Sequence, residues 1–276
     1  MTTNRSTNVS TLQKIKEVIA SHKGNGKELV RRLHRQKLRH LSWSQLSTVE
    51  RCPYEYYLAY VKHIPLDPEP DYFVKGRLFH EAAQGYYRAI CLGRSPRSTD
   101  FTKIIKKHKN AVARTHLSNA VEMLIRNAFT GWEVIGVEKP FALDLGPDLP
   151  PCVGVIDLVL KRANTFAVVD HKTARRMWPQ DPMQVAIYRE HILEEFGAQE
   201  CRAFFDMYRW VNNLDSIRTP AFLRKSARLS QKSFPRAVQR FEKGYAQIRQ
   251  IEETGTAKAS GDCWMCAYRS VCNRGY

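Results

Sequence analysis

The chain has 276 residues, 43% of them apolar, and a formal net charge of +17. A chain of this length and composition can bury a substantial core, which predicts one domain with additions rather than two equal domains. The large positive charge favours a polyanion such as nucleic acid as the partner, although a basic protein at a membrane surface would carry the same charge. No apolar stretch is long enough to span a bilayer. The first residues lack the apolar core of a signal peptide, so we expect a cytoplasmic protein.

The first sixty residues are predicted to be mainly helical, after a disordered start over residues 1–10. Apolar residues at helical spacing predict a helix over 12–19 and a second, strongly basic helix around 29–33. The basic residues suit phosphate contacts and equally suit a solvated helix face. Further along, Pro53 lies just inside another predicted helix, and the tyrosines after it favour a packed core over a base-stacking surface.

The rest of the chain is predicted to alternate helices and strands. Residues 65–70 are rich in proline and predict a stiff linker. The expected elements after it are helices over 73–86 and 100–130, strands over 132–145, 154–160 and 166–172, a helix over 184–196, a strand over 203–211, and an amphipathic helix over 234–251. This order predicts an α/β fold: a mixed central sheet flanked by helices, with an N-terminal helical region and a Cys-rich C-terminal tail.

The two strands over 154–160 and 166–172 predict a hairpin that carries two carboxylates and a lysine. Asp157 lies on the first strand, and Asp170 and Lys172 lie on the second. Residues i and i+2 of a strand point to the same face, so Asp170 and Lys172 project together with the backbone carbonyl of His171 between them. Carboxylate and carbonyl oxygens suit Mg²⁺ or Mn²⁺, which can polarise a phosphoryl group and activate water. Two ordinary strands with surface charges would show the same short pattern.

Two helices add polar residues that can join this group. His80 lies one turn after Gly76, whose small size would let another group approach closely. A helical histidine is more often a bystander than a ligand. After the hairpin, Gln184 and Tyr188 share one face of the predicted helix.

The chain has seven cysteines, and in a reducing compartment they argue against a disulfide framework. Three lie among apolar neighbours and are typical of buried packing residues: Cys91, Cys152 and Cys201. The other four form a split set: Cys52, Cys263, Cys266 and Cys272. Four thiolates suit either a zinc site or an iron–sulfur centre. One cysteine plus a trio is unlike the tight pairs of zinc ribbons, which favours the iron–sulfur centre.

In chain order, these motifs resemble those of a known family. They are Gly76-x-x-x-His80, Gly154-x-x-Asp157, Asp170-x-Lys172 and Gln184-x-x-x-Tyr188, with Cys52 and Cys263-x-x-Cys266-x5-Cys272 around them. The set is similar to the RecB-like branch of the PD-(D/E)XK nucleases. More narrowly, it resembles the iron–sulfur members, which include the AddB nuclease domain and the CRISPR adaptation exonucleases. The resemblance spans residues 42–272, with Asp170 where many relatives have Glu.

The resemblance implies a role for each motif. It implies metal ligation by His80, Asp157, Asp170 and the carbonyl of His171. It implies a catalytic set of Asp157, Asp170, Lys172, Gln184 and Tyr188, in which the last two support the lysine and the substrate strand. It implies a [4Fe–4S] cluster on Cys52, Cys263, Cys266 and Cys272. Glu81 lies outside the pattern, and we interpret it as a charge on the helix surface.

The predicted function is that of a divalent-metal-dependent DNA exonuclease that hydrolyses single-stranded ends with Mg²⁺ or Mn²⁺. Recombination, repair, CRISPR adaptation and phage DNA processing would all suit it. We expect a basic extension over 1–40 and a nuclease domain over 41–276 that Cys52 and residues 263–272 close through the cluster.

DNA is the expected partner, with basic segments at 31–39, 103–109 and 218–232 along its backbone. The alternative is a non-cutting nucleic-acid-binding or scaffold subunit of a helicase or integrase complex. The sequence has no Gly-x4-Gly-Lys-Ser/Thr loop, so any ATP-driven motor would lie on a partner chain.

Overall fold

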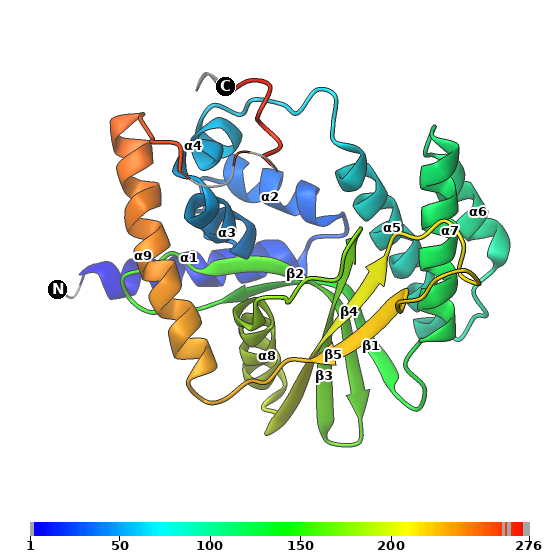
Figure 1. The fold of residues 1–276 in the computed structure, drawn as a ribbon. Helices are drawn as coiled ribbons and strands as arrows, with labels where there is room; N and C mark the ends of the chain where they lie inside the picture. Colours follow the sequence, from blue (N-terminus) through cyan, green and yellow to red (C-terminus); the bar gives the residue numbers. More distant parts are fainter. Residues whose placement is uncertain (1–2, 261–262, 264–265, 273–276) are drawn as a thin grey trace. The chain divides into compact units, whose positions relative to one another are not determined.

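The computed structural model describes the whole chain except residues 1–2, 261–262, 264–265 and 273–276 (Figure 1). The chain divides into two compact units, which we describe separately. The first unit comprises residues 1–70, 140–154 and 232–276, and the second comprises residues 71–139 and 155–231. Among the described residues, none of the helices is both long and apolar enough to cross a membrane.

The second unit holds most of a mixed β-sheet and the helices that cover it. The strands are β1 (Glu133–Leu143), β2 (Cys152–Arg162), β3 (Thr165–Ala174), β4 (Glu200–Arg209) and β5 (Phe222–Ser226). Within the described residues they follow one another in the order β1-β2-β3-β4-β5. β2 and β3 run antiparallel, β3 and β4 parallel, and β4 and β5 antiparallel. The predicted mixed sheet is therefore confirmed, whereas β5 was not expected from the sequence.

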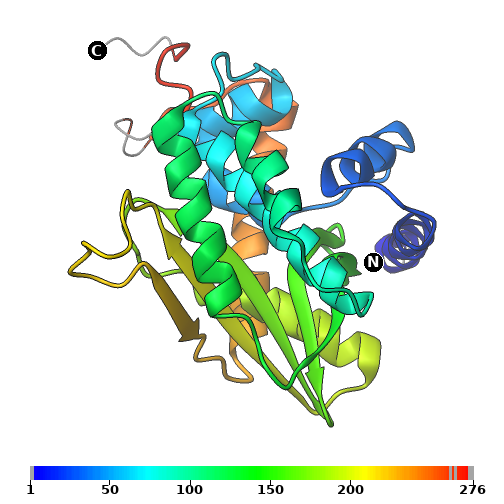
Figure 2. The same cartoon turned by 90° about the vertical axis from the view of Figure 1, so that its right-hand side faces the viewer.

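Helices cover both faces of this sheet in the second unit. The helices are α5 (Asp71–Cys91), α6 (Ser98–Lys106), α7 (Ala111–Arg126) and α8 (Pro182–Phe196). α5 and α7 lie on one face and α8 on the other, as Figures 1 and 2 show. β3 is buried from Phe166 to His171, as expected of a central strand covered on both faces.

The predicted hairpin forms, and its register brings the acidic residues together. The register pairs Leu158 with Val169 and continues to Arg162 and Thr165 beside the turn. Leu158 and Val169 both pack in the core that α5 and α7 cover. Asp157 comes just before Leu158 on β2, and Asp170 comes just after Val169 on β3. Because side chains alternate along a strand, both carboxylates point to the face opposite this core.

α8 has clear start and stop signals that fix its position in the sequence. The side chain of Asp181 accepts the backbone N–H of Met183, and Pro182 occupies the first turn. The helix ends at Gly197, whose φ of 59° is the left-handed conformation that favours glycine. At the C-terminal end of α8, Glu195 accepts from Lys139 of β1 at 2.8 Å. This ion pair links the helix to the strand that precedes the hairpin.

The first unit is mostly helical. Its helices are α1 (Thr3–Ala20), α2 (Gly26–Arg35), α3 (Trp43–Arg51), α4 (Pro53–Tyr56), the π-helix η1 (Tyr57–Val61) and α9 (Ser233–Thr254). The prediction of disorder over residues 1–10 is wrong for residues 3–10, because α1 begins at Thr3, and residues 1–2 lie outside the described residues. Once the apolar turns over 12–19 are helical, each further residue adds one hydrogen bond without the cost of a new helix nucleus. A polar stretch can therefore extend the helix.

Gly154 of the predicted Gly154-x-x-Asp157 motif has a packing reason within the first unit. A Cβ at this position would lie 2.6 Å from Cε1 of Phe141, a ring that is 2% exposed. Glycine therefore lets β2 lie flat against a buried aromatic ring just before the strand reaches Asp157.

We expect Glu195→Gln to destabilise the protein near neutral pH and to lose this effect in acid. Hydrogen bonds from His191 and Lys139 lower the pKa of Glu195 from 4.5 to about 2. A lowered carboxyl pKa stabilises the folded state above the unfolded-state pKa, and this contribution is lost as pH falls through the folded-state pKa. The difference in unfolding free energy between wild type and variant should therefore shrink between pH 4.5 and about pH 2.

Urea denaturation at a series of pH values measures this difference. Glu190→Gln removes the same charge from another position of α8 and serves as the control. A Glu195→Gln difference that stays constant down to the acid limit would contradict the assignment.

Candidate active site

A cluster of one histidine and two carboxylates lies in the second unit. His80 comes from α5, Glu138 from β1 and Asp157 from β2. Nδ1 of His80 lies 3.5 Å from Oδ1 of Asp157 and 3.9 Å from Oε1 of Glu138. One potential ligand atom of each residue lies within 4.8 Å of the others, which is close enough for all to bind the same ion. The cluster combines nitrogen and carboxylate ligands, a set that suits Mn²⁺ and related divalent cations.

Backbone geometry orients the two carboxylates of this cluster. The N–H of His171 on β3 donates to Oδ2 of Asp157 at 2.7 Å, which leaves Oδ1 toward His80. Glu138 has a φ of 49°, a left-handed conformation that is uncommon for residues other than glycine. Such strained positions concentrate at functional sites. The strands therefore hold the carboxylate of Asp157 through a hydrogen bond and set the backbone position from which Glu138 projects.

The charges of the cluster depend on one another. Burial opposes a positive charge on His80, but Asp157 and Glu138 outweigh it and raise the pKa of His80 to about 10. Burial likewise opposes ionisation of Asp157, yet the charge of His80 and its hydrogen bond hold the pKa of that carboxyl well below its usual range. The two carboxylates thus stabilise one positive charge between them. A divalent cation can take the place of the imidazolium proton, since metal ligands must be deprotonated.

Next to this cluster, polar contacts join four of the predicted site residues. Nζ of Lys172 lies 2.8 Å from Oδ2 of Asp170 and donates to Oε1 of Gln184 at 3.1 Å. Nε2 of Gln184 in turn donates to the hydroxyl of Tyr188 at 2.7 Å. Asp170 and Lys172 therefore share a face of β3, as expected, and α8 supplies the groups that hold the lysine.

Asp170 and Lys172 also shift each other's protonation. Burial, helped by Asp157 and opposed by Lys172, raises the pKa of Asp170 to about 6. Burial would lower the pKa of Lys172, but Asp170 reverses this and raises it. Lys172 is therefore protonated at neutral pH, so it acts as a cation and a hydrogen-bond donor. It is not a ready base.

His171 contributes its backbone to the site and its side chain to the core. Its ring is 2% exposed and stacks on Tyr87, with centroids 6.0 Å apart and an interplanar angle of 10°. Neither ring nitrogen has a hydrogen-bond partner in the described structure. The metal ligation predicted for the carbonyl of His171 remains a prediction.

Glu138 is the residue that sequence reasoning missed. It belongs to no motif identified in the sequence, and its strand was predicted only as an element leading to the hairpin. The available signal was an acidic residue in the middle of a largely apolar strand, in the same sheet as Asp157. At Gly76, the nearest described group to an added Cβ would be Oγ1 of Thr173 at 3.6 Å, an ordinary contact distance, so packing within the protein does not require glycine there.

The cysteines lie mostly as predicted, with one exception. All seven are free thiols; Cys152 and Cys201 are buried, but Cys91 is exposed, so its prediction as a packing residue is wrong. Cys91 is the last residue of α5, where the helix leaves the core. The split set is half-buried in the first unit: Cys52, Cys263, Cys266 and Cys272. Burial raises the pKa of Cys266, and Cys52 and Cys272 lie near enough to raise it further.

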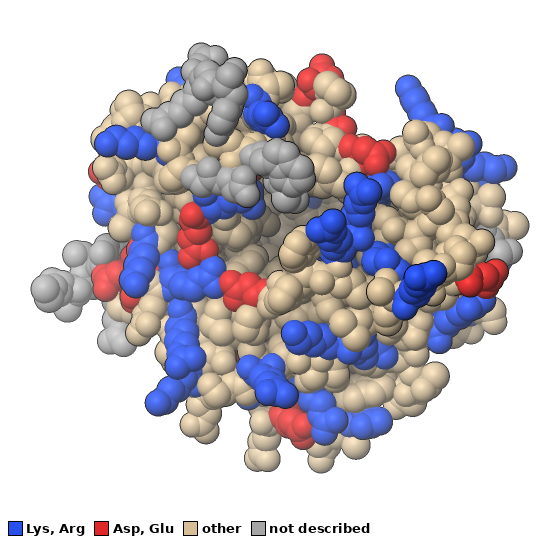
Figure 3. All heavy atoms as spheres, viewed as in Figure 1, with Lys and Arg blue, Asp and Glu red and all other residues tan. Residues whose placement is uncertain are grey.

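Basic side chains spread widely over the face shown in Figure 3, including the part that the sheet and its helices form. Arg224 in the basic segment at 218–232 is an exception to the predicted phosphate contacts. Its guanidinium holds the fully buried Asp206 through contacts of 2.8 and 2.7 Å and donates to the carbonyl of Asn127. Its role is structural. Lys107 in the segment at 103–109 pairs with Glu81, which is the surface charge expected there.

The fold and the site together define an α/β protein with a half-buried acidic cluster beside a lysine, an arrangement suited to metal-dependent phosphodiester chemistry. The chain belongs to the PD-(D/E)XK nuclease superfamily, whose family model matches residues 40–273. Membership of this superfamily indicates a metal-dependent nuclease, a hydrolase that acts on DNA. No curated protein sequence matches the chain.

Among the solved structures that match, one is similar over most of both chains. It is described as "Crystal structure of SSO0001", and it has 17% sequence identity and a TM-score of 0.39 over 95% of this chain and 94% of that chain. At this identity and score, the likeness adds nothing to the assignment, which depends on the family match and the site.

We expect Glu138→Gln to weaken Mn²⁺ binding by at least about tenfold, the loss typical even of residues that only orient a metal ligand. The substitution keeps the shape of the side chain but removes the charge that the cluster needs. Isothermal titration calorimetry of the metal-free protein with Mn²⁺ measures the affinity. Glu133→Gln removes the same charge from the exposed start of β1 and should leave the affinity unchanged. Equal affinity of wild type and Glu138→Gln would remove Glu138 from the metal centre.

Proposed function

We propose that this chain is a DNA exonuclease of the RecB-like type, which shortens single-stranded ends with Mg²⁺ or Mn²⁺. The observation that carries the proposal is the contact between Lys172 and Asp170 beside the cluster of His80, Glu138 and Asp157. A protonated lysine next to a potential metal site is suited to phosphodiester hydrolysis, because both can offset the charge that develops on the phosphate. The preference for single-stranded ends rests on the sequence resemblance alone.

The residues present fit a divalent metal. His80, Glu138 and Asp157 supply closely spaced ligand atoms, and Asp170 supplies a further buried carboxylate next to them. We assign His80, Asp157 and Asp170 as side-chain ligands, with the carbonyl of His171 as the predicted fourth group and Glu138 as an addition. A metal bound there would polarise the phosphodiester and lower the pKa of water.

The protein side chains then have separate tasks. Lys172, protonated and held by Gln184, offsets the growing charge on the phosphate and donates a hydrogen bond to the attacking water or to a phosphate oxygen. Tyr188 positions Gln184, because its hydroxyl accepts a 2.7 Å hydrogen bond from Nε2 of Gln184. The backbone N–H of His171 holds Asp157 in place. Exposed basic residues elsewhere on the chain, including the extension over 1–40, would bind the DNA backbone.

We also propose that Cys52, Cys263, Cys266 and Cys272 hold a [4Fe–4S] cluster. The donor set fits, because four half-buried cysteines of the first unit form no disulfide, and Cys266 lies near enough to Cys52 and Cys272 for their charges to interact. The hydroxyl of Tyr268, between these cysteines in sequence, donates to the carbonyl of Ile64 at 3.1 Å and so attaches the tail to the segment after η1. The cluster would be structural, since hydrolysis transfers no electron.

We expect Lys172→Ala to lower the rate of DNA cleavage by about 10²–10³-fold, the usual loss when one group that stabilises developing charge is removed. End-labelled linear and circular single-stranded DNA are incubated with Mg²⁺, Mn²⁺ or EDTA. Linear DNA should be shortened from an end in the presence of metal, and circles should stay intact. Lys161→Ala removes an exposed lysine from the same hairpin and should retain wild-type activity.

Each alternative result has a distinct meaning in this assay. Cleavage of circles would contradict exonuclease action and leave nuclease activity standing. Full activity of Lys172→Ala would overturn the site. A folded wild-type protein that cuts none of the substrates would overturn the proposed function.

Protein purified without oxygen should be coloured and contain roughly four iron and four sulfide ions per chain, as a [4Fe–4S] centre requires. Cys266→Ser should lose most of this iron and unfold at a lower temperature, because the link between the tail and Cys52 is lost. Cys91→Ser changes an exposed cysteine outside the set and should keep the full iron content. Bound zinc in place of iron, or full iron in Cys266→Ser, would refute the cluster assignment.

A further inference from the structure

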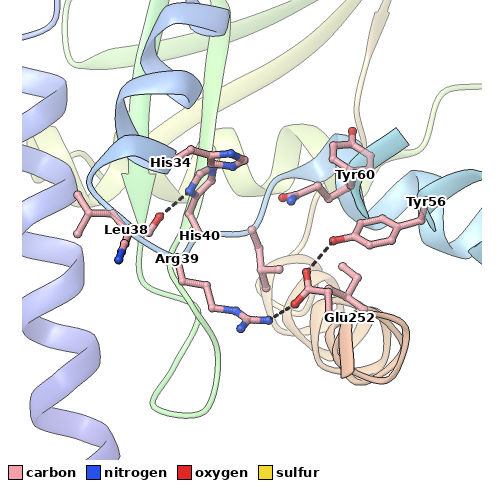
Figure 4. Close-up of a pocket in the computed structure, with 11 residues that line it drawn as sticks. His34, Leu38, Arg39, His40, Tyr56, Tyr60 and Glu252 are labelled. Atoms are coloured by element: carbon pink, nitrogen blue, oxygen red, sulfur yellow. Dashed lines mark hydrogen bonds and ion pairs between the residues drawn. The ribbon is translucent and has the colours of Figure 1, made fainter. Parts of the chain in front are cut away.

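A pocket of about 490 Å³ lies within the first unit, and none of the residues assigned to the nuclease reaction lines it. It is formed by the end of α2 and the segment after it, by α3, α4 and η1, and by α9. Its volume lies within the range of about 300–1,000 Å³ that is usual for small-molecule sites. Its walls differ in chemistry. In Figure 4, His34, His40 and Arg39 lie on one side and Tyr56 and Tyr60 on the other.

The basic side of the pocket is held in position before any ligand arrives. Nη2 of Arg39 donates to Oε2 of Glu252 at 2.6 Å, and its guanidinium lies 5.3 Å from the centre of the Tyr245 ring. More than half of the Arg39 side chain is nevertheless exposed, at 53%. Nδ1 of His40 donates to the carbonyl of Leu38 at 3.0 Å, which fixes its ring. A held but exposed guanidinium is suited to bind a phosphate, because little freedom is lost on binding.

Lys37, on the same wall, occupies a backbone position that normally belongs to glycine. The N–H of Lys37 donates to the carbonyl of His34 and that of Leu38 to Leu33, which is the Schellman pattern that ends a helix. Lys37 takes the left-handed position of this motif, with φ of 53°. A lysine near a helix C-terminus gains some energy from the helix dipole, but the same charge in the last turn would gain it without strain. The strain is explained if the charge is needed in the pocket.

The opposite wall is aromatic. Tyr56 and Tyr60 stack on each other, with centroids 4.9 Å apart and planes inclined by 24°. Tyr56 is almost fully buried and donates to Oε1 of Glu252 at 3.2 Å, whereas Tyr60 keeps more of its surface open. Glu252 thus holds a residue of each wall. Because Tyr56 is buried, the partly exposed ring of Tyr60 is the surface of this wall on which a nucleobase can stack.

We propose that this pocket binds one nucleotide, with the phosphate at Lys37 and Arg39 and the base against the tyrosine wall. The pocket is larger than inorganic phosphate needs, and its basic side chains lie on one side only, with Glu252 between the two walls. Both a free mononucleotide and the phosphorylated end of a DNA strand have this chemistry. The proposal goes beyond cleavage, because all of its residues belong to the first unit and the nuclease site belongs to the second.

Binding is measured by calorimetry in EDTA, so that failure of the nuclease proposal leaves the test intact. The probes are dAMP, inorganic phosphate, and a short single strand with either a 5′-phosphate or a 5′-hydroxyl. Binding of dAMP with weaker binding of phosphate supports the site and identifies a free nucleotide. Tighter binding of the 5′-phosphorylated strand than of the 5′-hydroxyl strand, without binding of dAMP, supports it and identifies a strand end, whereas equal affinity for the two strands without binding of dAMP overturns it. Equal affinity for phosphate and dAMP, or binding of none of the probes, overturns the proposal.

The variants separate a ligand contact from a structural role. Arg39→Gln and Lys37→Gly should each weaken binding at least tenfold. Lys37→Gly should at the same time raise the unfolding temperature, because glycine relieves the left-handed strain. Lys243→Gln removes an exposed charge from α9 outside the pocket and should bind dAMP like wild type. Unchanged binding in Lys37→Gly and Arg39→Gln, or equal losses in Lys243→Gln, would refute this pocket as the binding site.

Discussion

The candidate active site depends on the concentration of negative charge at one end of the β2–β3 hairpin. Asp157 and Asp170 lie next to the Leu158–Val169 pair, on the side away from the turn. Glu138 of the neighbouring strand β1 lies close to Asp157. Carboxylates in such surroundings are unfavourable unless cations offset them. Two cations do so here: His80 keeps Asp157 ionised, and Lys172 contacts Asp170. Such a cluster of partly buried charges contributes little to the stability of the fold, but it is well suited to bind a metal ion.

The hairpin also explains how the core and the site are connected. Alternation along β3 places Asp170 and Lys172 toward α8 and the intervening His171 ring toward Tyr87 in the core. Because that ring is locked by aromatic packing, the backbone N–H beside it is fixed as well, and it holds Asp157. A single residue that performs no chemistry with its side chain thus transmits the rigidity of the core to a carboxylate.

Much of this could be predicted from the sequence, because the signals were local. The hairpin, the shared face of Asp170 and Lys172, and the contact between Gln184 and Tyr188 all follow from side-chain period within one element. Glu138 could not be predicted, because its importance comes from a left-handed bend and from sheet order, which no local pattern reveals. Arg224 was misread for the same reason: its partner Asp206 lies on the neighbouring strand, so a segment that reads as basic surface contains a buried ion pair.

The first unit raises a different question, namely why a lysine occupies a position that suits glycine. The hydrogen bonds that end α2 would form equally well with glycine at position 37, and without left-handed strain. The helix end therefore explains the backbone but not the side chain. Arg39, two residues later, is held by Glu252 and Tyr245 yet stays more than half exposed. Lys37 is thus placed at the cost of backbone strain, and Arg39 is held in position but left exposed. Both line one pocket, and an anionic ligand explains these features better than the stability of the fold does.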